Sequence, residues 1–311
     1  MGEEVRQSAA PRAPGDFAGS GRPGDPAAGQ AYKPLVPAMR WLLYVAAILV
    51  LLAGFQLFVF TERSDSFFAW TILNPLAAAF LGAAYWASVA IEALAGRQLV
   101  WANARIAVPT VLIFTILTLV ASLLHLDKFH LGSGFAPGTR AVTWAWLAIY
   151  VLVPLLMLLV LIVQARAPGS EPPRRAPLHG WICAALAGQA LVLLGVGTAL
   201  FAIPDQANAF WPWKLTPLLA QVTGAWLISL GVAAVHALYE RDARRLRPAA
   251  VGYLLLVVLQ AIALARYPAI FQWGSAAGVI YLIALATMLA VGAAGFVRGL
   301  PRDLRNSPHV V

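Results

Sequence analysis

The sequence predicts an all-α integral membrane protein with eight transmembrane helices, arranged as a tandem duplication of a four-helix unit. Of the 311 residues, 61% are hydrophobic and only 11% are charged, whereas soluble domains carry about 45–50% apolar and about 25% charged residues. Eight apolar stretches are long enough to cross a bilayer, which requires about 20 residues each. The second four stretches resemble the first four. These observations exclude a soluble globular protein.

The elements follow in order along the chain. Residues 1–38 are rich in Pro, Gly and Ala without helical or strand periodicity, which predicts a disordered cytoplasmic tail. The next apolar run is about 20 residues long, as in a membrane helix and unlike the shorter core of a signal peptide. The predicted spans are 41–60, 72–96, 105–125, 141–164, 181–203, 214–238, 248–266 and 275–297. They form two membrane units, 39–164 and 181–298, with a cytoplasmic linker at 165–180 and a cytoplasmic C-terminal tail at 299–311.

The basic residues predict the orientation, because short cytoplasmic loops retain Lys and Arg. With the N-terminus inside, the cytoplasmic segments hold 17 of the 22 basic residues and the outer loops hold 5. An even number of spans then places both termini in the cytoplasm. This asymmetry accounts for most of the net charge of +9, so we predict membrane lipid and no nucleic acid as a partner. The Arg-rich and Ala-rich composition is typical of bacteria, and we expect the bacterial plasma (inner) membrane.

The duplication is visible as matched Trp, Pro and Gly positions. An offset of 142 residues places Pro75 and Gly82 on Pro217 and Gly224. Because each unit has an even number of spans, the two units are expected to be parallel repeats about an axis along the membrane normal. Small-xxx-small patterns end at Gly82 and Gly224, and we expect them to bring the second and sixth spans together at the seam.

Acidic and aromatic residues recur with the same spacing in the outer loops of both units. The candidate outer-rim site comprises Glu62, Asp65, Trp70, His125, Asp127, His130, Asp205, Trp211 and Trp213. The turns at 129–133 and 271–275 are expected to lie beside the aromatics of their own unit. An aromatic belt at the membrane interface is the alternative. His and Asp are metal-ligand types, but the two histidines lie five residues apart and are unmatched in the second unit, so we predict no metal and no cofactor.

Two ionisable residues lie within spans, about one turn from the cytoplasmic end. Glu92 and His236 occupy nearly equivalent places in the two units and form a candidate inner pair. In the alternative interpretation, each side chain snorkels separately to the interface.

The sequence predicts the function less closely than the membrane topology. Walker A, HExxH and GxSxG motifs are missing, and the centres of the spans carry neutral polar residues, which argues against coupling through a midplane carboxylate. We predict a permease-like or lipid- and small-molecule-handling protein that binds a small uncharged or amphipathic ligand at the seam. One alternative is a non-catalytic scaffold or accessory subunit that binds another membrane subunit. The other is a membrane-embedded enzyme acting on a lipid-soluble substrate at the outer rim. The missing motifs favour a protein that is not an enzyme.

Overall fold

The computed structural model describes residues 31–300, and this part of the chain is helical without β-strands. Eight of its helices are long and apolar enough to span a membrane. They are α1 (Pro37–Val59), α3 (Pro75–Gly96), α5 (Ala107–Leu124), α6 (Pro137–Arg166), α7 (Gly180–Ala202), α9 (Pro217–Glu240), α10 (Arg247–Arg266) and α11 (Ala276–Gly299). Their limits lie within four residues of the predicted spans, so the prediction of a multi-pass helical membrane protein is confirmed at this level. The predicted tails, apart from their ends next to the membrane units, lie outside the described residues.

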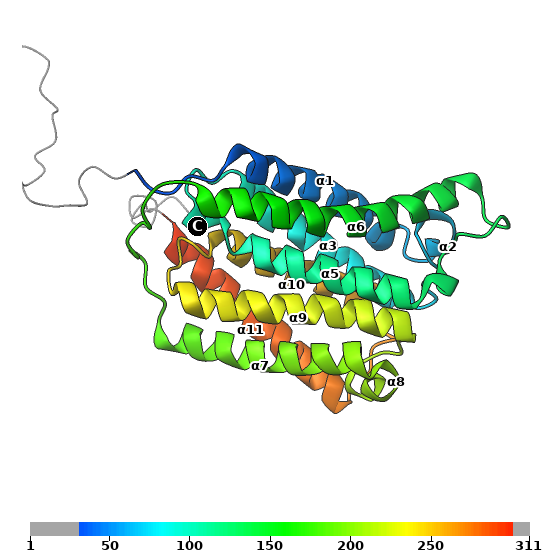
Figure 1. Cartoon of the computed structure of the whole chain (residues 1–311). Coiled ribbons are helices and arrows are strands. Elements are labelled where there is room, and N and C mark those ends of the chain that lie inside the picture. The colour runs from blue at the N-terminus through cyan, green and yellow to red at the C-terminus, as the bar shows by residue number, and fades with distance from the viewer. Residues whose placement is uncertain (1–30, 301–311) are drawn as a thin grey trace, which may run out of the picture. The chain divides into compact units, whose positions relative to one another are not determined.

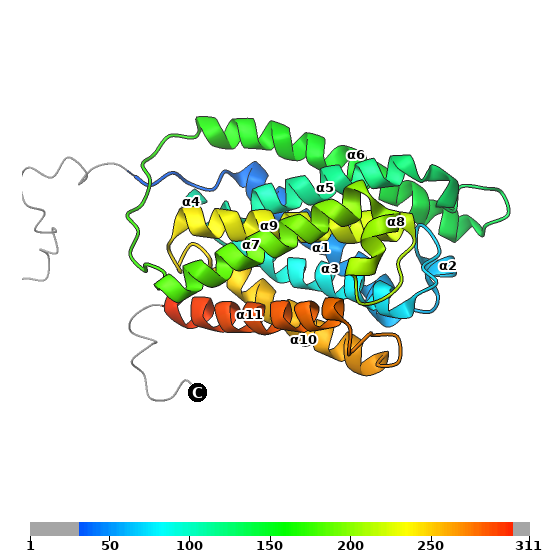
Figure 2. The same cartoon turned by 90° about the horizontal axis from the view of Figure 1, so that it is seen from below.

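Short helices lie in the loops between the spans. At one end of the helices, on the right in Figures 1 and 2, are α2 (Ser64–Phe67) and α8 (Pro204–Ala207). At the other end, α4 (Trp101–Ala104) connects α3 to α5. A 3₁₀ turn at Leu126–Lys128 lies in the loop between α5 and α6, and a second one at Asn208–Phe210 directly follows α8. The end with α2 and α8 is the outer face in the predicted orientation.

The second and sixth spans, α3 and α9, are the most buried helices of the bundle. α3 packs mainly against α1 and α10, and α9 packs mainly against α7 and α5. α5 therefore packs across the seam onto the central helix of the other four helices, and α10 does the same in the opposite direction. Figures 1 and 2 show the long helices running alongside one another.

The two central helices begin in the same way. Each has a proline in its first turn, where the missing N–H is not needed for helix hydrogen bonds. The Asn74 side chain caps α3 by accepting backbone N–H bonds, and Thr216 caps α9. The Asn74 amide also donates to the Lys214 carbonyl at 3.0 Å, so the two capping segments are joined directly.

The small-residue patterns have a different role from the expected one. A Cβ on Gly82 would lie 2.5 Å from the backbone nitrogen of Phe58 in α1. A Cβ on Gly224 would lie 2.6 Å from the carbonyl oxygen of Gly197 in α7. The two glycines thus permit close packing of α3 on α1 and of α9 on α7, and not of α3 on α9. The expectation that they bring the two central helices together was wrong, because these glycines face the preceding span of the chain.

The segment before α1 contacts the loops at the α4 end. The Lys33 N–H donates to the Ser170 carbonyl at 3.0 Å, and the Leu35 N–H donates to Leu99 at 2.9 Å. The Gln164 side chain of α6 bonds both Val36 N–H and the carbonyl oxygen of the residue at 34, each at 2.9 Å. Residues 32–36, predicted to belong to the tail, are therefore held against the membrane helices.

Candidate functional site

A small cavity with polar residues in its wall lies between α1, α3, α5 and α6. Its volume is about 80 Å³, and Trp226 of α9 also lines it. α3 contributes Tyr85, Ser88 and Glu92, which are three and four residues apart and so share one face of the helix. We call this space the Glu92 cavity. It contacts five spans, four from the first half of the chain and one from the second.

Glu92 is the charged residue of this cavity. Its side chain is buried, with 1% of its surface exposed. Within residues 31–300, its Oε2 atom has no hydrogen-bond partner. Burying a carboxyl group without a partner is costly, so ionisable residues in membrane spans usually serve a function. Glu92 is therefore a candidate binding residue.

Three hydroxyl groups of the cavity lining are directed by their own helices. Ser88, Thr110 and Thr115 each donate to the backbone carbonyl four residues earlier, at 2.9–3.2 Å. A hydroxyl group has one proton and two acceptor lone pairs. These three groups have thus used their proton, and what they can offer a ligand is an acceptor oxygen.

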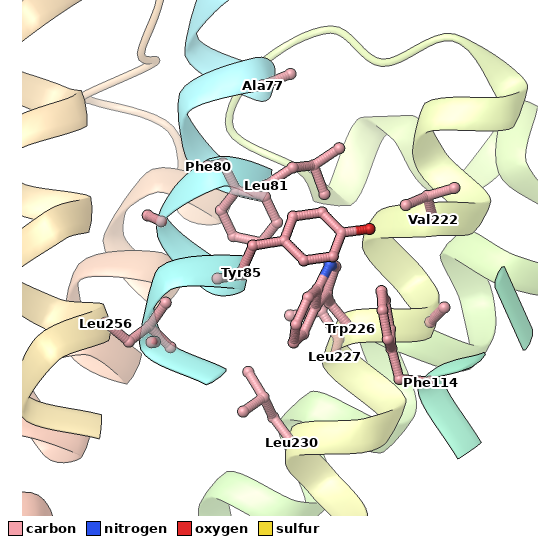
Figure 3. Close-up of a cluster of buried hydrophobic side chains, with 14 of the residues drawn as sticks. Ala77, Phe80, Leu81, Tyr85, Phe114, Val222, Trp226, Leu227, Leu230 and Leu256 are labelled. Atoms are coloured by element: carbon pink, nitrogen blue, oxygen red, sulfur yellow. The ribbon is translucent and has the colours of Figure 1, made fainter. Parts of the chain in front are cut away.

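Aromatic rings form much of the remaining wall. The Tyr85 and Tyr150 hydroxyls are hydrogen-bonded at 2.6 Å, which leaves one phenolic proton for a further partner. Trp226 packs edge-to-face on Tyr85, with ring centroids 5.2 Å apart, and lies 4.0 Å from Phe114 (Figure 3). The Trp226 N–H has no hydrogen-bond acceptor among the described residues and lies against the Tyr85 ring (Figure 3). The seam between the two halves is consequently aromatic at this level.

The outer-rim tryptophans are buried, and they do not form a lipid-facing belt. Trp70 packs against Trp146 and Phe129, with ring centroids 5.0 and 5.3 Å apart. Trp213 packs in the same manner against Phe80 and Tyr281, at 5.7 and 5.4 Å. Trp211 is also buried and lies 4.9 Å from Trp213. These contacts give the three rings a packing role, because each is enclosed by rings from other segments of the chain.

The expected neighbourhood of the outer turns is confirmed. The His130 N–H donates to the Ala69 carbonyl at 3.0 Å, which joins the turn at 129–133 to the segment that carries the first tryptophan. In the second half, the Gln272 N–H donates to the Pro212 carbonyl at 3.0 Å. The same loop-to-loop contact thus occurs twice.

The histidines of the outer rim have separate partners. The His130 nitrogens are bonded to the Thr71 hydroxyl at 2.9 Å and to the Phe68 carbonyl at 3.0 Å. His125 is bonded to Gln221 of α9 at 2.9 Å. Within residues 31–300, no three His, Cys, Asp or Glu side chains are placed to hold a metal ion.

The acidic residues of the rim are exposed, and none of them is hydrogen-bonded to those histidines within the described residues. Asp127 forms a surface ion pair with Lys128 at 2.7 Å, and this hydrogen bond lowers the pKa of Asp127. Glu62 accepts a hydrogen bond from Tyr267 at 3.4 Å. Asp65 borders an open hollow of about 500 Å³ next to α6. Asp205, in α8, is also exposed. Hydrogen bonds therefore do not join the rim residues into one site.

The candidate inner pair is not joined by a hydrogen bond. His236 lies 3.1 Å from Glu240, the last residue of α9, which is buried and also bound by Arg105 and Arg245. Glu171 of the linker accepts from the same two arginines, at 2.7 and 2.6 Å. Burial would lower the pKa of Arg105, but its contacts with Glu240 and Glu171 raise it. Glu240 is thus a fully paired carboxylate, whereas Glu92 neither pairs with His236 nor snorkels to the interface.

Sequence reasoning identified Glu92 but missed its neighbours on the cavity wall. Tyr85 and Ser88 lie on the same face of α3 as Glu92, and Tyr150 faces them from α6. The available signal was the polar spacing of three and four residues within an otherwise apolar span. Nothing in that spacing shows that α6 supplies the opposite hydroxyl.

Comparisons with known proteins assign the chain to no family. No protein-family model matches it, and neither does a curated protein or a solved structure.

Proposed function

We propose that the protein is a permease-like membrane protein that binds a small polar molecule in the Glu92 cavity and passes it across the bilayer. The observation that carries this proposal is the buried carboxyl group of Glu92, which has an oxygen without a partner among the described residues. A group of this kind lowers stability unless a ligand or ion completes its interactions. The cavity also contains Trp226 from the second half, so a molecule bound there contacts both halves.

We propose further that the two halves are a tandem duplication related by an axis along the membrane normal. Corresponding helices make corresponding contacts: α1 with α3 and α7 with α9, α5 with α6 and α10 with α11, and α5 with α9 and α10 with α3. This exchange of α5 and α10 across the seam is expected for a two-fold arrangement of parallel repeats. Relative movement of two such units is the usual basis of alternating access in transporters.

Both termini are proposed to lie in the cytoplasm of a bacterium, on the basic-residue distribution described above. The test uses a chain in which Cys183 is replaced by Ser. Single cysteines are then introduced at Ala136, which is exposed, or at Asn208 or Ser170, and intact cells are treated with a membrane-impermeant thiol reagent. The first two positions should react and Ser170 should not. Labelling at Ser170 from outside would reverse the orientation.

The scaffold and outer-rim enzyme alternatives have less support. The rim histidines are bonded to groups of the protein and do not meet the rim carboxylates. A scaffold has no need of an unpaired carboxyl group in a membrane span.

Tracer exchange in proteoliposomes tests the proposed function. The purified full chain is reconstituted, and equilibrium exchange of radiolabelled guanidinium, urea and glycerol is compared with that of empty liposomes. We expect faster exchange of at least one solute, lost in Glu92→Gln and kept in Glu62→Gln, which removes a carboxylate outside the cavity. Background exchange of all three solutes, or equal exchange in Glu92→Gln, would contradict the proposal.

A further inference from the structure

We infer that the ligand of the Glu92 cavity is a small organic cation rich in N–H groups, of the ammonium or guanidinium type. This inference rests on the proposed function, because it takes the cavity as the binding site. Charge, hydrogen-bond direction, aromatic content and volume each support it.

The cavity lining carries an acidic residue without a basic one from the described part of the chain. Glu92 is the charged residue among those that line it, and no Lys, Arg or His from the described part of the chain does so. The five charged or ionisable groups that form the ion-pair cluster near the end of α9 are bonded among themselves, so they do not compensate Glu92. A ligand with a positive charge would supply the missing partner, and such a pair is strongest where water is excluded.

The directions of the hydrogen bonds around the cavity favour a ligand that donates hydrogen bonds. The Ser88, Thr110 and Thr115 hydroxyls have given their protons to their own helices, and the Glu92 oxygens accept. The Tyr85–Tyr150 pair keeps one proton that could be donated. Acceptors thus outnumber donors around the cavity, and a ligand with several N–H groups can satisfy more of them than one with several oxygens.

The aromatic walls also favour a cation. Phe114, Trp146, Tyr150 and Trp226 line the cavity together with Tyr85. The faces of aromatic rings attract ammonium and guanidinium groups, and this attraction is greater in desolvated sites. An apolar solute could also occupy such walls, but it would leave Glu92 without a partner.

The volume limits the size of the charged group. The cavity measures about 80 Å³, whereas a cavity of about 150 Å³ holds benzene. A group of a few non-hydrogen atoms is therefore appropriate. Guanidinium meets this limit, keeps its charge at all accessible pH values and has only donors. Urea has the same planar shape with one oxygen in place of a nitrogen, and it is neutral.

Equilibrium binding of this matched pair tests the inference. The full chain in lipid nanodiscs is titrated with guanidinium chloride or urea at constant ionic strength, and tryptophan fluorescence is recorded, since Trp146 and Trp226 line the cavity. We expect a saturable change with guanidinium and none with urea over the same range. Glu92→Gln should weaken guanidinium binding by roughly tenfold or more, because a charge-assisted hydrogen bond is lost.

Two further variants separate binding from folding. Glu62→Gln is the matched control and should bind guanidinium like the original chain. Phe114→Leu keeps an apolar side chain but removes a ring, and it should weaken guanidinium binding several-fold.

The outcomes distinguish this inference from the proposed function. Saturable urea binding that requires Glu92, without guanidinium binding, would overturn the inference that the ligand is a cation. The ligand would then be a neutral molecule bound by a protonated Glu92. Guanidinium binding of equal strength in Glu92→Gln would place the cation elsewhere and overturn the inference. Exchange of urea or glycerol that depends on Glu92, together with no guanidinium binding, would leave the proposed function standing and reject only the cation.

Discussion

The two halves of the molecule each contain a cavity next to a central helix, and the two cavities differ in chemistry. The second cavity, of about 60 Å³, lies between α7, α9, α10 and α11, with Phe80 and Ala84 of α3 in its wall. We call it the Gln260 cavity, after its polar side chain. The Gln260 amide donates to the Phe80 carbonyl at 3.1 Å and accepts from the Tyr281 hydroxyl at 2.9 Å. Its polar side chain is thus paired on both sides.

In the proposed duplication, equivalent positions of α3 and α9 carry different residues. At the offset of 142, Leu227 corresponds to Tyr85 and Leu230 corresponds to Ser88. Both leucines line the Gln260 cavity. Ala234 corresponds in turn to Glu92. The helical framework is therefore built in the second half without these polar groups, which indicates that packing does not require them in the first.

Trp226 belongs to both cavities. In Figure 3 it lies next to Tyr85 and Phe114, and Phe114 also lines the Glu92 cavity. A ligand that moves this ring in one cavity would change the wall of the other. This shared residue is a direct physical connection between the two cavities.

The largest stability effect is expected in the Gln260 cavity. Gln260→Leu should destabilise the protein by about 1–3 kcal/mol, because the buried Tyr281 hydroxyl loses its partner. Guanidinium binding should be unchanged. Thermal unfolding in detergent and the fluorescence titration check the two statements. Unchanged stability would mean that the paired polar side chain of this cavity is dispensable, and the contrast between the cavities would be lost.

Replacement of the unpaired Glu92 carboxyl group is expected to increase stability, opposite to the effect of Gln260→Leu. Glu92→Met should raise stability by about 1 kcal/mol, because it removes a buried polar group without a hydrogen-bond partner. The same substitution should abolish guanidinium binding, as expected where a functional group reduces stability. The same two assays apply. A marked loss of stability would show that Glu92 has a structural partner and would contradict the account.

The smallest effect is expected outside both cavities. A chain that begins at Tyr32 keeps every residue of the two cavities and the bonds of Lys33 and Leu35 to the loops. Its free energy of unfolding should lie within about 0.5 kcal/mol of that of the full chain, the range typical of changes away from packed features. A large drop in melting temperature would show that the first 31 residues support one of the cavities.

The helices could be predicted because each span is a continuous apolar run of sufficient length. The limits of α7 and α10 differ from the predicted ones by one residue at most. The predicted first span begins at residue 41 and α1 begins at Pro37, because residues 37–40 are less apolar than the rest of the helix. A proline is favoured in the first turn of a helix, so this position was a usable signal.

The chemistry of the site was harder to predict than the spans. Glu92 was noticed as an ionisable residue near a helix end, but its burial depends on α5 and α6, which lie far from it in sequence. Trp70 and Trp213 were found through their repeated spacing. Their burial follows from rings such as Trp146 and Tyr281 on later helices. Spacing along one segment shows which residues share a face, and it does not show what packs against that face.

Photolabelling tests the central claim most directly, namely that the Glu92 cavity and not the Gln260 cavity binds the ligand. The full chain in nanodiscs is irradiated with a small diazirine-bearing alkylguanidinium, digested, and mapped by mass spectrometry with and without excess guanidinium. The account expects label within residues 85–92 of α3 or 146–153 of α6, reduced by guanidinium and by Glu92→Gln. Label concentrated within residues 192–196 of α7 or 280–288 of α11, or label insensitive to Glu92→Gln, would contradict it.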